Sequence, residues 1–450
     1  GFTDSKVFSK YGILLKNLGE LKEAEKFQKK AIEIDPKYMN AYLNLGIIMK
    51  YVGKLKEAVE PLRRFIEINP NHVNSLNILG NLLRDLGELK EAEVLMKKVV
   101  KLKPLSGAAH SNLGFIFLSK GENELALSCF YKSCHLLRFN RQNNPDPILS
   151  FGLISKSKIK HDIEQFEYLI SKGIEAKKFL KLVNIYNKLL LEIDWPSENE
   201  IFSIDENYQF LLKDNYNLLL HRIETERFDF SVLNDSLDYD EITDDYLEHD
   251  FGLTYIDELL NPIALESLRR FLLCSTIWFG IKNGGYLGAY LTQGFANPLL
   301  LQIAEELRIK FPKIFKNYSL NQAWAFKYDS EAKNENSNLS GINVHADFAA
   351  VNVNFWITPS YANLDLNSGG LIVYDVEAPK DWDFNTYNRD QKKIQQELKK
   401  SKGKTIVIPY RGNRAVIFNS NLFHETDNYF FKDGYENRRI NITMLFGSRN

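Results

Sequence analysis

The sequence predicts a multidomain protein in which an all-α repeat array precedes a mainly-β domain with supporting helices. Two observations predict this organisation in the 450-residue chain. The first third repeats itself every 34 residues, and the last 200 residues contain several runs in which apolar and polar side chains alternate. A long fixed period is typical of stacked helical repeats, and alternation is typical of half-buried strands. We therefore expect a repeat array over residues 1–140, a helical cap and acidic linker over 141–250, and a β domain over 251–450.

The repeat is defined by small residues in three registers at one period: Gly12, Gly46, Gly80 and Gly114; Gly19, Gly53, Gly87 and Gly121; Ala24, Ala58, Ala92 and Ala126. With prolines at 36, 70 and 104 and an LKEA motif, the pattern resembles the tetratricopeptide repeat. The resemblance implies four helix pairs. The first glycine and the alanine allow the helices to approach closely, and the second glycine ends the first helix. Arg138 stands where a fourth proline is expected, which marks the end of the array.

A solenoid of this kind has a concave groove lined by the first helix of each repeat. Polar residues on those helices are suited to hydrogen-bonding an extended peptide: Asn44, Lys50, Asn77, Asn81, Arg84 and Asn112. We expect a protein or peptide partner there. A surface used only for dimerisation or packing is the competing interpretation, and the oligomeric state stays open.

Charge and composition exclude several classes of protein. The 57 basic and 58 acidic side chains nearly cancel, so no global basic field indicates nucleic acid. Charge is unevenly spread, with 22 basic and 15 acidic residues in 1–140 but 3 basic and 17 acidic in 194–250. No apolar run is long enough to span a membrane. Three cysteines without zinc-type spacing predict free thiols in a reducing, cytoplasmic setting: Cys129, Cys134 and Cys274.

The acidic region and the following domain are expected to contain helices, strands and loops in order. Amphipathic runs near 161–173 and 175–194 predict cap helices, residues 207–223 have a helical pattern, and 236–250 read as a linker. Helices are expected from Asn261 and from Asn297, then a strand that places Trp324, Phe326 and Tyr328 on one face. The polar stretch 331–340 predicts a lid. Residues 405–418 predict a tight hairpin that turns at Gly412 and Asn413.

Candidate metal ligands occur in and after the strand-like segment 341–358. His345 and Asp347 lie two residues apart, which would place both side chains on one face of a strand. Asn352 and Asn354 follow, and by simple parity they would face away from the ligands unless a bulge intervenes. His424 lies near the end of a later β-type run. Two imidazoles and one carboxylate on one side of an ion leave its other positions open, as in non-haem iron oxygenases.

The order of these residues, with Arg439 and Asn441 opening a further strand after His424, resembles the 2-oxoglutarate- and Fe(II)-dependent dioxygenases. The resemblance covers the C-terminal half and implies a double-stranded β-helix, or jelly roll. It implies iron bound by His345, Asp347 and His424, with 2-oxoglutarate and O2 as cosubstrates. Arg439, rather than Arg438 on the opposite face, would hold the distal carboxylate through its planar fork. Further candidate contacts to the cosubstrate are Tyr328, Asn354 and Asn441.

The resemblance predicts an oxygenase that hydroxylates a protein or peptide side chain presented by the repeat array. Similarity to prolyl hydroxylases favours proline as the target. The carboxylate of Asp347 favours hydroxylation over halogenation, because related halogenases lack it. Two alternatives remain open: a hydroxylase of a small molecule or free amino acid, and a repeat scaffold whose jelly roll binds metal without catalysis.

Overall fold

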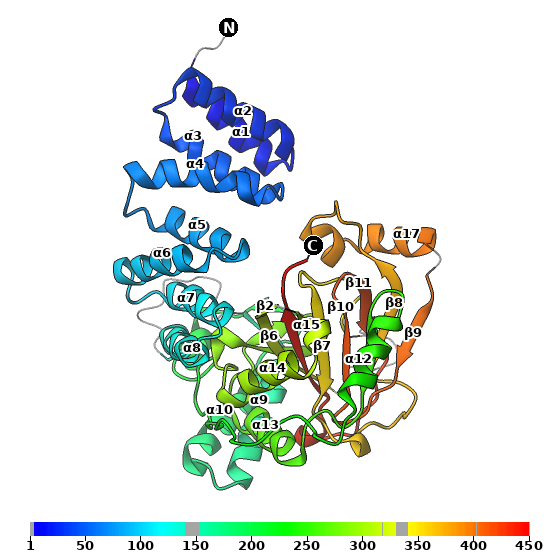
Figure 1. Cartoon of the computed structure of the whole chain (residues 1–450). Helices are drawn as coiled ribbons and strands as arrows, with labels where there is room; N and C mark the ends of the chain where they lie inside the picture. Colours follow the sequence, from blue (N-terminus) through cyan, green and yellow to red (C-terminus); the bar gives the residue numbers. More distant parts are fainter. Residues whose placement is uncertain are drawn as a thin grey trace. The chain divides into compact units, whose positions relative to one another are not determined.

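The computed structural model describes residues 4–139, 153–197, 199–316, 318–329, 341–401 and 403–449. Figure 1 shows an α-helical N-terminal part followed by a β-rich C-terminal part. The chain forms two compact units, Gly1–Ser133 and Cys134–Asn450. The boundary lies inside a helix.

The first unit is built from antiparallel helix pairs, as the 34-residue period predicts. Its helices are α1 (Ser5–Asn17), α2 (Leu21–Ile34), α3 (Met39–Tyr51), α4 (Leu55–Ile68), α5 (Val73–Asp85), α6 (Leu89–Leu102), α7 (Gly107–Ser119) and the first part of α8 (Asn123–Arg138). A Cβ atom on Gly46 would lie 2.6 Å from Leu62 Cγ, so only glycine allows α3 and α4 to approach this closely. Gly53, which follows α3, has a φ of +84°, the left-handed conformation that ends a helix. Both predicted roles of the repeated glycines are confirmed.

The second unit contains the remaining helices and all strands. Its helices are α9 (Lys156–Ser171), α10 (Ala176–Glu192), α11 (Glu206–Leu212), α12 (Tyr239–Glu248), α13 (Pro262–Cys274), α14 (Pro298–Lys310), α15 (Pro312–Phe315), α16 (Phe384–Arg389) and α17 (Gln391–Ser401). Its strands are β1 (Leu153–Ile154), β2 (Phe202–Ser203), β3 (Leu253–Ile256), β4 (Gly280–Lys282), β5 (Tyr286–Tyr290), β6 (Leu320–Tyr328), β7 (Val351–Trp356), β8 (Leu371–Glu377), β9 (Thr405–Ile408), β10 (Ala415–Asn419), β11 (Leu422–Thr426) and β12 (Ile440–Phe446).

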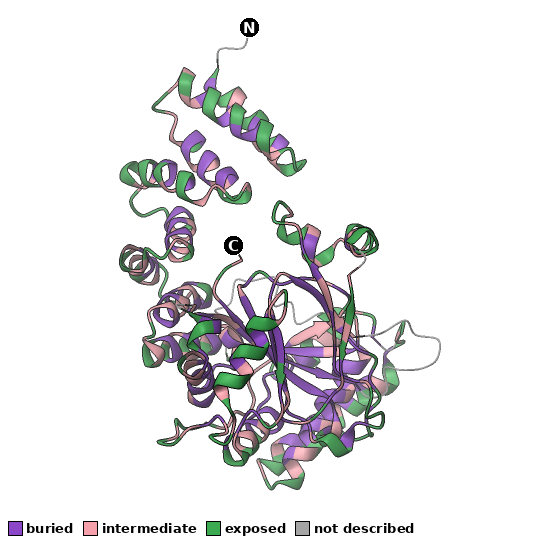
Figure 2. Cartoon of the chain, turned by 45° about the vertical axis from the view of Figure 1, so that its right-hand side comes forward, coloured by how far each residue is buried: buried purple, intermediate pink, exposed green. Residues whose placement is uncertain are grey.

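Two antiparallel sheets form the centre of this unit. One has seven strands in the order β3-β10-β7-β12-β6-β5-β4, and the other has three in the order β11-β8-β9. The inner faces share a core that includes Trp356 and Phe418 from the larger sheet and Val373, Ile408 and Leu422 from the smaller one. Figure 2 shows that the strands are mainly buried. The C-terminal region is therefore β-rich and antiparallel, as predicted.

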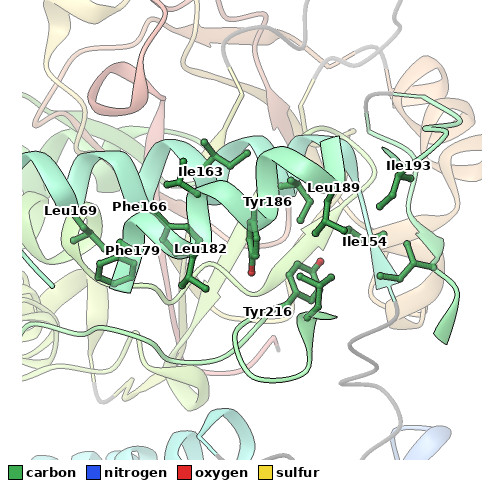
Figure 3. Close-up of a cluster of buried hydrophobic side chains, with 14 of the residues drawn as sticks. Ile154, Ile163, Phe166, Leu169, Phe179, Leu182, Tyr186, Leu189, Ile193 and Tyr216 are labelled. Atoms are coloured by element: carbon green, nitrogen blue, oxygen red, sulfur yellow. The ribbon is translucent and has the colours of Figure 1, made fainter. Parts of the chain in front are cut away.

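Helices α9 and α10 contribute a second apolar cluster inside the same unit. Figure 3 shows Phe166 and Leu169 of α9 facing Phe179, Leu182 and Tyr186 of α10. Glu164 of α9 also accepts hydrogen bonds from both Nε (2.6 Å) and Nη2 (3.0 Å) of Arg438. Residues 153–197, expected to belong to a cap of the repeat array, therefore pack within the unit that holds the sheets.

Three local expectations differ from the structure. Residues 405–418 are not a hairpin, because β9 pairs with β8 in the small sheet whereas β10 pairs with β3 and β7 in the large one. The stretch expected to be a linker contains α12, whose N-terminus is capped by the Asp238 carboxylate. The helical pattern of 207–223 yields only the short helix α11. The predicted lid, residues 331–340, lies outside the described residues.

Candidate metal centre

Two separate segments bring the predicted ligands together. His345 lies outside the regular strands and forms an antiparallel bridge with His424 of β11. The His345 amide donates to the His424 carbonyl at 3.0 Å, and the reverse bond is 2.8 Å. Asp347 is also outside a strand, and its amide donates to the Ser420 carbonyl. The expectation of a continuous strand through both residues was wrong, yet the backbone bonds fix both side chains beside His424.

The three side chains converge on one point. One ligand atom from each of His345, Asp347 and His424 can be chosen so that all lie within 4.8 Å of one another. Asp347 Oδ1 is 3.8 Å from His345 Nε2, and Asp347 Oδ2 is 3.5 Å from His424 Nε2. Among the described residues this is the one such group of histidine, cysteine or acidic side chains. The spacing fits a single ion bound by two imidazoles and a carboxylate.

Hydrogen bonds on the far side of each ligand orient it. His345 Nδ1 lies 2.8 Å from the Asn343 carbonyl, and His424 Nδ1 lies 3.0 Å from the Leu422 carbonyl. A carbonyl accepts only, so both Nδ1 atoms carry the proton and both Nε2 atoms keep a free lone pair. Asn352 Nδ2 donates to Asp347 Oδ2 at 2.7 Å. These bonds leave the unprotonated Nε2 atoms of both histidines and the Asp347 carboxylate available to bind a cation.

Burial and neighbouring charges also favour the ligand forms of two of these groups. Burial, assisted by His424, lowers the pKa of His345 to about 4, so this imidazole is neutral at physiological pH. Burial alone would raise the pKa of Asp347. The proximity of His424 and His345 and the hydrogen bond from Asn352 outweigh it, and the pKa of Asp347 is lowered. The site therefore combines a neutral base and an ionised acid.

Arg439, immediately before β12, is buried near the ligands. Its Nε donates to the Gly369 carbonyl at 2.8 Å, and its Nη2 donates to the Gly370 carbonyl at 3.2 Å. Its guanidinium carbon lies 4.6 Å from the centre of the Tyr328 ring. In the described parts of the chain, no carboxylate lies within ion-pair distance of Arg439. A buried cation without an acidic partner is a favourable place for an anion.

One cavity contains the ligands, Arg439 and the predicted amide and tyrosine contacts. It holds about 380 Å³ of empty space, including its opening to solvent, and is lined by Trp324, Phe326, Tyr328, Ile342, His345, Asp347, Asn352, Asn354, Leu371, His424, Thr426, Arg439, Asn441 and Thr443. Asn352 and Asn354 face the cavity and not away from the ligands, because bends at residues 348–350 interrupt the alternation between Asp347 and β7. Asn441 Nδ2 donates to Asn354 Oδ1 at 3.2 Å.

Some polar atoms of this cavity are unpaired. Trp324 Nε1, Tyr328 Oη and Asn352 Oδ1 are buried, and none has a hydrogen-bond partner within the described ranges. Burying such groups is unfavourable unless a ligand or water satisfies them. The sequence did not single out Tyr410 and Tyr429, whose rings lie 5.9 and 5.8 Å from the Arg439 guanidinium. The sequence signal that could have indicated this part of the cavity was the glycine pair 369–370, whose carbonyls accept hydrogen bonds from Arg439.

In the repeat array, the predicted groove residues are partly exposed, apart from the exposed Lys50. Asn112 Nδ2 donates to Asn77 Oδ1 at 3.2 Å, which links α7 to α5. Asn44 Nδ2 donates to Ser9 Oγ at 3.2 Å. Asn81 Oδ1 is buried and has no partner in the described residues. Arg84 pairs with its neighbour Asp85 at 2.8 Å. Asn44 and Asn112 therefore form hydrogen bonds between neighbouring repeats.

Comparison with known proteins identifies the N-terminal repeats. Three tetratricopeptide-repeat family models match residues 5–38, 27–60 and 73–103. The N-terminal region therefore consists of tetratricopeptide repeats, which generally mediate interactions between proteins. None of the curated proteins matches the chain.

Solved structures of MamA proteins share limited similarity with the chain. MamA from Desulfovibrio magneticus RS-1 is 25% identical, with 30% of this chain and 76% of that chain covered and a TM-score of 0.29. MamA AMB-1 is 28% identical, with 29% and 71% covered and a TM-score of 0.28. A further MamA crystal structure is 18% identical, with 43% and 97% covered and a TM-score of 0.29. Within the described residues, no helix is both long and apolar enough to cross a lipid bilayer.

Proposed function

We propose that the second unit is an Fe(II)- and 2-oxoglutarate-dependent oxygenase with a double-stranded β-helix formed by the two sheets. We further propose that it hydroxylates a side chain of a protein or peptide. The observation that carries the proposal is the presence in one cavity of three convergent metal ligands and a buried arginine without an acidic partner. A metal alone would explain His345, Asp347 and His424. It would not explain Arg439, whose charge calls for an anion.

The residues present fit both an iron ion and a diacid. Two imidazole nitrogens and one carboxylate suit Fe(II) and leave positions for further ligands. Arginine has five N–H donors, and three of them serve Gly369, Gly370 and Asn441, so two remain for a carboxylate. The unpaired Tyr328 hydroxyl lies against the same guanidinium. These groups would bind the distal carboxylate of 2-oxoglutarate while its other end faces the ligands.

With iron and 2-oxoglutarate bound, the chemistry supplied would be decarboxylation of 2-oxoglutarate by O2 to succinate and CO2, with one oxygen atom of O2 entering succinate and the other entering a substrate C–H bond. The chain's own residues position the reactants. Arg439 orients the cosubstrate, and Asn352 holds the Asp347 carboxylate in its binding position. Leu371, Phe326 and Ile342 contribute apolar walls that limit water at the reacting atoms.

A metal-binding titration with matched variants tests the first part. Fe(II) under anaerobic conditions, or Mn(II) as its substitute, should bind one site in the intact protein. His424→Ala and Asp347→Ala should each weaken binding at least tenfold. His110→Ala, in the repeat array, is the control, because its ring nitrogen contacts only the Pro104 carbonyl. Equal binding by all four proteins would refute the assigned ligands.

Succinate release from 2-oxoglutarate tests the activity. We expect Fe(II)-dependent release that a suitable peptide substrate increases and that Asp347→Ala abolishes. Hydroxylation of an amino acid or other small molecule, without stimulation by any peptide, would favour the small-molecule alternative. Metal binding without turnover under every condition would identify a repeat scaffold with a non-catalytic metal site.

A further inference from the structure

The backbone of the ligand segment, residues 344–347, is held from two sides. On one side, His424 and Ser420 bond to the amide and carbonyl of His345 and to the amide of Asp347. In an extended chain the backbone groups of successive residues point to alternate sides, so those of the intervening residues face the other way. The helix pair α16–α17, which follows β8 and precedes β9 (Figure 1), meets the segment on that second side.

The junction between α16 and α17 supplies three hydrogen bonds to the ligand segment. Asn388 Nδ2 donates to the Ala346 carbonyl at 3.0 Å, and Gln391 Nε2 donates to the Val344 carbonyl at 2.9 Å. The Ala346 amide donates to the Tyr387 carbonyl at 3.0 Å. These bonds satisfy backbone groups of buried residues, as a neighbouring strand would.

Together the two sides hold three consecutive peptide units. A peptide unit is planar, so hydrogen bonds at both its C=O and its N–H fix its orientation. Each of the units 344–345, 345–346 and 346–347 has one bond to His424 or Ser420 and one to the helix junction. Because the units on both sides of His345 are fixed, its φ and ψ angles are fixed too. The side chains of His345 and Asp347 therefore leave the backbone in defined directions.

Apolar packing supports the same junction. Val344 and Ala346 belong to one buried cluster with Tyr387 of α16 and Ile394 of α17. Since side chains alternate along an extended segment, this cluster lies on the face opposite the ligands. The start of α17 is fixed locally, because the Asp390 carboxylate accepts a hydrogen bond from an amide of its first turn. The two amide side chains thus extend from a rigid support.

We propose that Asn388 and Gln391 are positioning residues for the metal centre, which they support through the backbone of the ligand segment. This inference rests on the proposed metal site and adds that the ligand geometry depends on α16–α17. Covering an exposed backbone edge would need only the apolar side chains of these helices. The two amide donors instead meet the carbonyls immediately before and immediately after His345.

Two variants remove the donors. Gln391→Met keeps the length of the side chain and loses its N–H groups, and Asn388→Ala removes the other amide. Gln395→Met and Asn385→Ala are the matched controls, because they place the same changes on the same two helices at exposed positions. Neither control side chain forms a hydrogen bond within the described part of the chain.

Metal affinity and coordination are measured on the full chain. Anaerobic titration with Mn(II) gives the Kd, and the visible absorption of bound Co(II) reports the coordination geometry. We expect each donor variant to raise the Kd for Mn(II) about tenfold and to shift the Co(II) bands. Each control should leave the Kd within about twofold and the bands unchanged, as is usual for exposed substitutions.

Hydrogen exchange of the metal-free protein supplies a second measurement that needs no ion. The amides of His345 and Asp347 should exchange faster in the donor variants, whereas the amides of β12 should exchange as in the intact chain. A role in general stability would instead accelerate exchange in β12 as well. Urea denaturation establishes that each variant is folded before metal is added.

Two results would overturn the inference. The first is an Mn(II) affinity and a Co(II) spectrum that are the same in donor and control variants. The second is faster exchange throughout the second unit in the donor variants. Failure of the intact chain to bind Mn(II) is a distinct outcome, which would refute the proposed metal site and this inference with it.

Discussion

Replacing Arg439 with lysine is the sharpest test of the cosubstrate site. Lysine keeps the positive charge and loses the planar fork, so the two-point geometry of carboxylate binding is lost together with the bonds to Gly369 and Gly370. Arg439 has two N–H donors free of the bonds to Gly369, Gly370 and Asn441. A hydrogen bond to a charged group contributes about 1.5–3 kcal/mol, so losing one of two should raise the Kd for 2-oxoglutarate roughly 10- to 150-fold.

Isothermal titration of 2-oxoglutarate into the anaerobic Fe(II)-loaded protein measures this Kd directly. Arg414→Lys is the matched control. Arg414 also forms a two-point contact, with Nε and Nη2 bound to the Asp257 carboxylate at 2.6 and 2.9 Å, but it lies outside the cavity. Metal affinity should be unchanged in both variants. A Kd for 2-oxoglutarate within twofold of the original in Arg439→Lys would refute the assigned role of this side chain.

Other substitutions probe the support of the site and the repeats. Asn352→Ala removes the hydrogen bond to Asp347 and should weaken metal binding roughly 10- to 100-fold in a competition titration; unchanged affinity would contradict the positioning role. Gly370→Ala places a Cβ atom 1.9 Å from the Ile408 carbonyl and should reduce the free energy of unfolding by about 1–3 kcal/mol or more, measured by urea denaturation. Glu25 is mainly buried, and its hydrogen bonds and proximity to two lysines lower its pKa below the ordinary 4.5 despite burial. Its folded-state pKa lies below its unfolded-state pKa, so its stabilising effect is present above pH 4.5 and is lost as the pH falls through the folded-state value. Glu25→Gln should therefore lower Tm at pH 7, and the difference in Tm should shrink as the pH falls below 4.5; calorimetry over a series of pH values tests this hypothesis, and a difference that stays constant with pH would contradict it.

The regular features of the fold could be predicted because they depend on local patterns. Repeated glycines and alanines specify helix pairs whose close packing needs no distant partner, as Gly46 against Leu62 shows. The alternation in 320–328 predicted β6 and the shared face of Trp324, Phe326 and Tyr328 for the same reason.

Features that depend on distant pairing could not be predicted in this way. Gly412 and Asn413 have the composition of a hairpin turn, yet the flanking strands find partners in different sheets. The acidic stretch that forms α12 has a weak apolar pattern, and its helix buries only Thr243 and Tyr246 among its ten residues. Long-range strand pairing determines the structure around Gly412 and Asn413, and a few buried contacts determine α12.

The convergence of the three candidate metal ligands was predictable from the sequence, although their local structure was not. His345 and Asp347 do not share a regular strand, and a bridge to His424 replaces it. The direction of the Asn352 and Asn354 side chains depends on the break before β7, which apolar periodicity does not encode. Residue type and order therefore indicate which side chains are candidate ligands. Backbone hydrogen bonds of the folded chain set the orientation of these side chains.

The consecutive arginines 438 and 439 show why the cavity calls for an anion. Successive residues of an extended chain point to opposite faces, and both side chains are buried. Arg438 meets two carboxylates, with Nη1 3.3 Å from Asp329 and Nε 2.6 Å from Glu164. Burial works against its charge, but these carboxylates raise its pKa above the usual value. The fold thus neutralises one buried guanidinium fully. Arg439 receives only carbonyl and amide oxygens and tyrosine rings from the described residues, and this difference supports our proposal that a bound anion supplies its counter-charge.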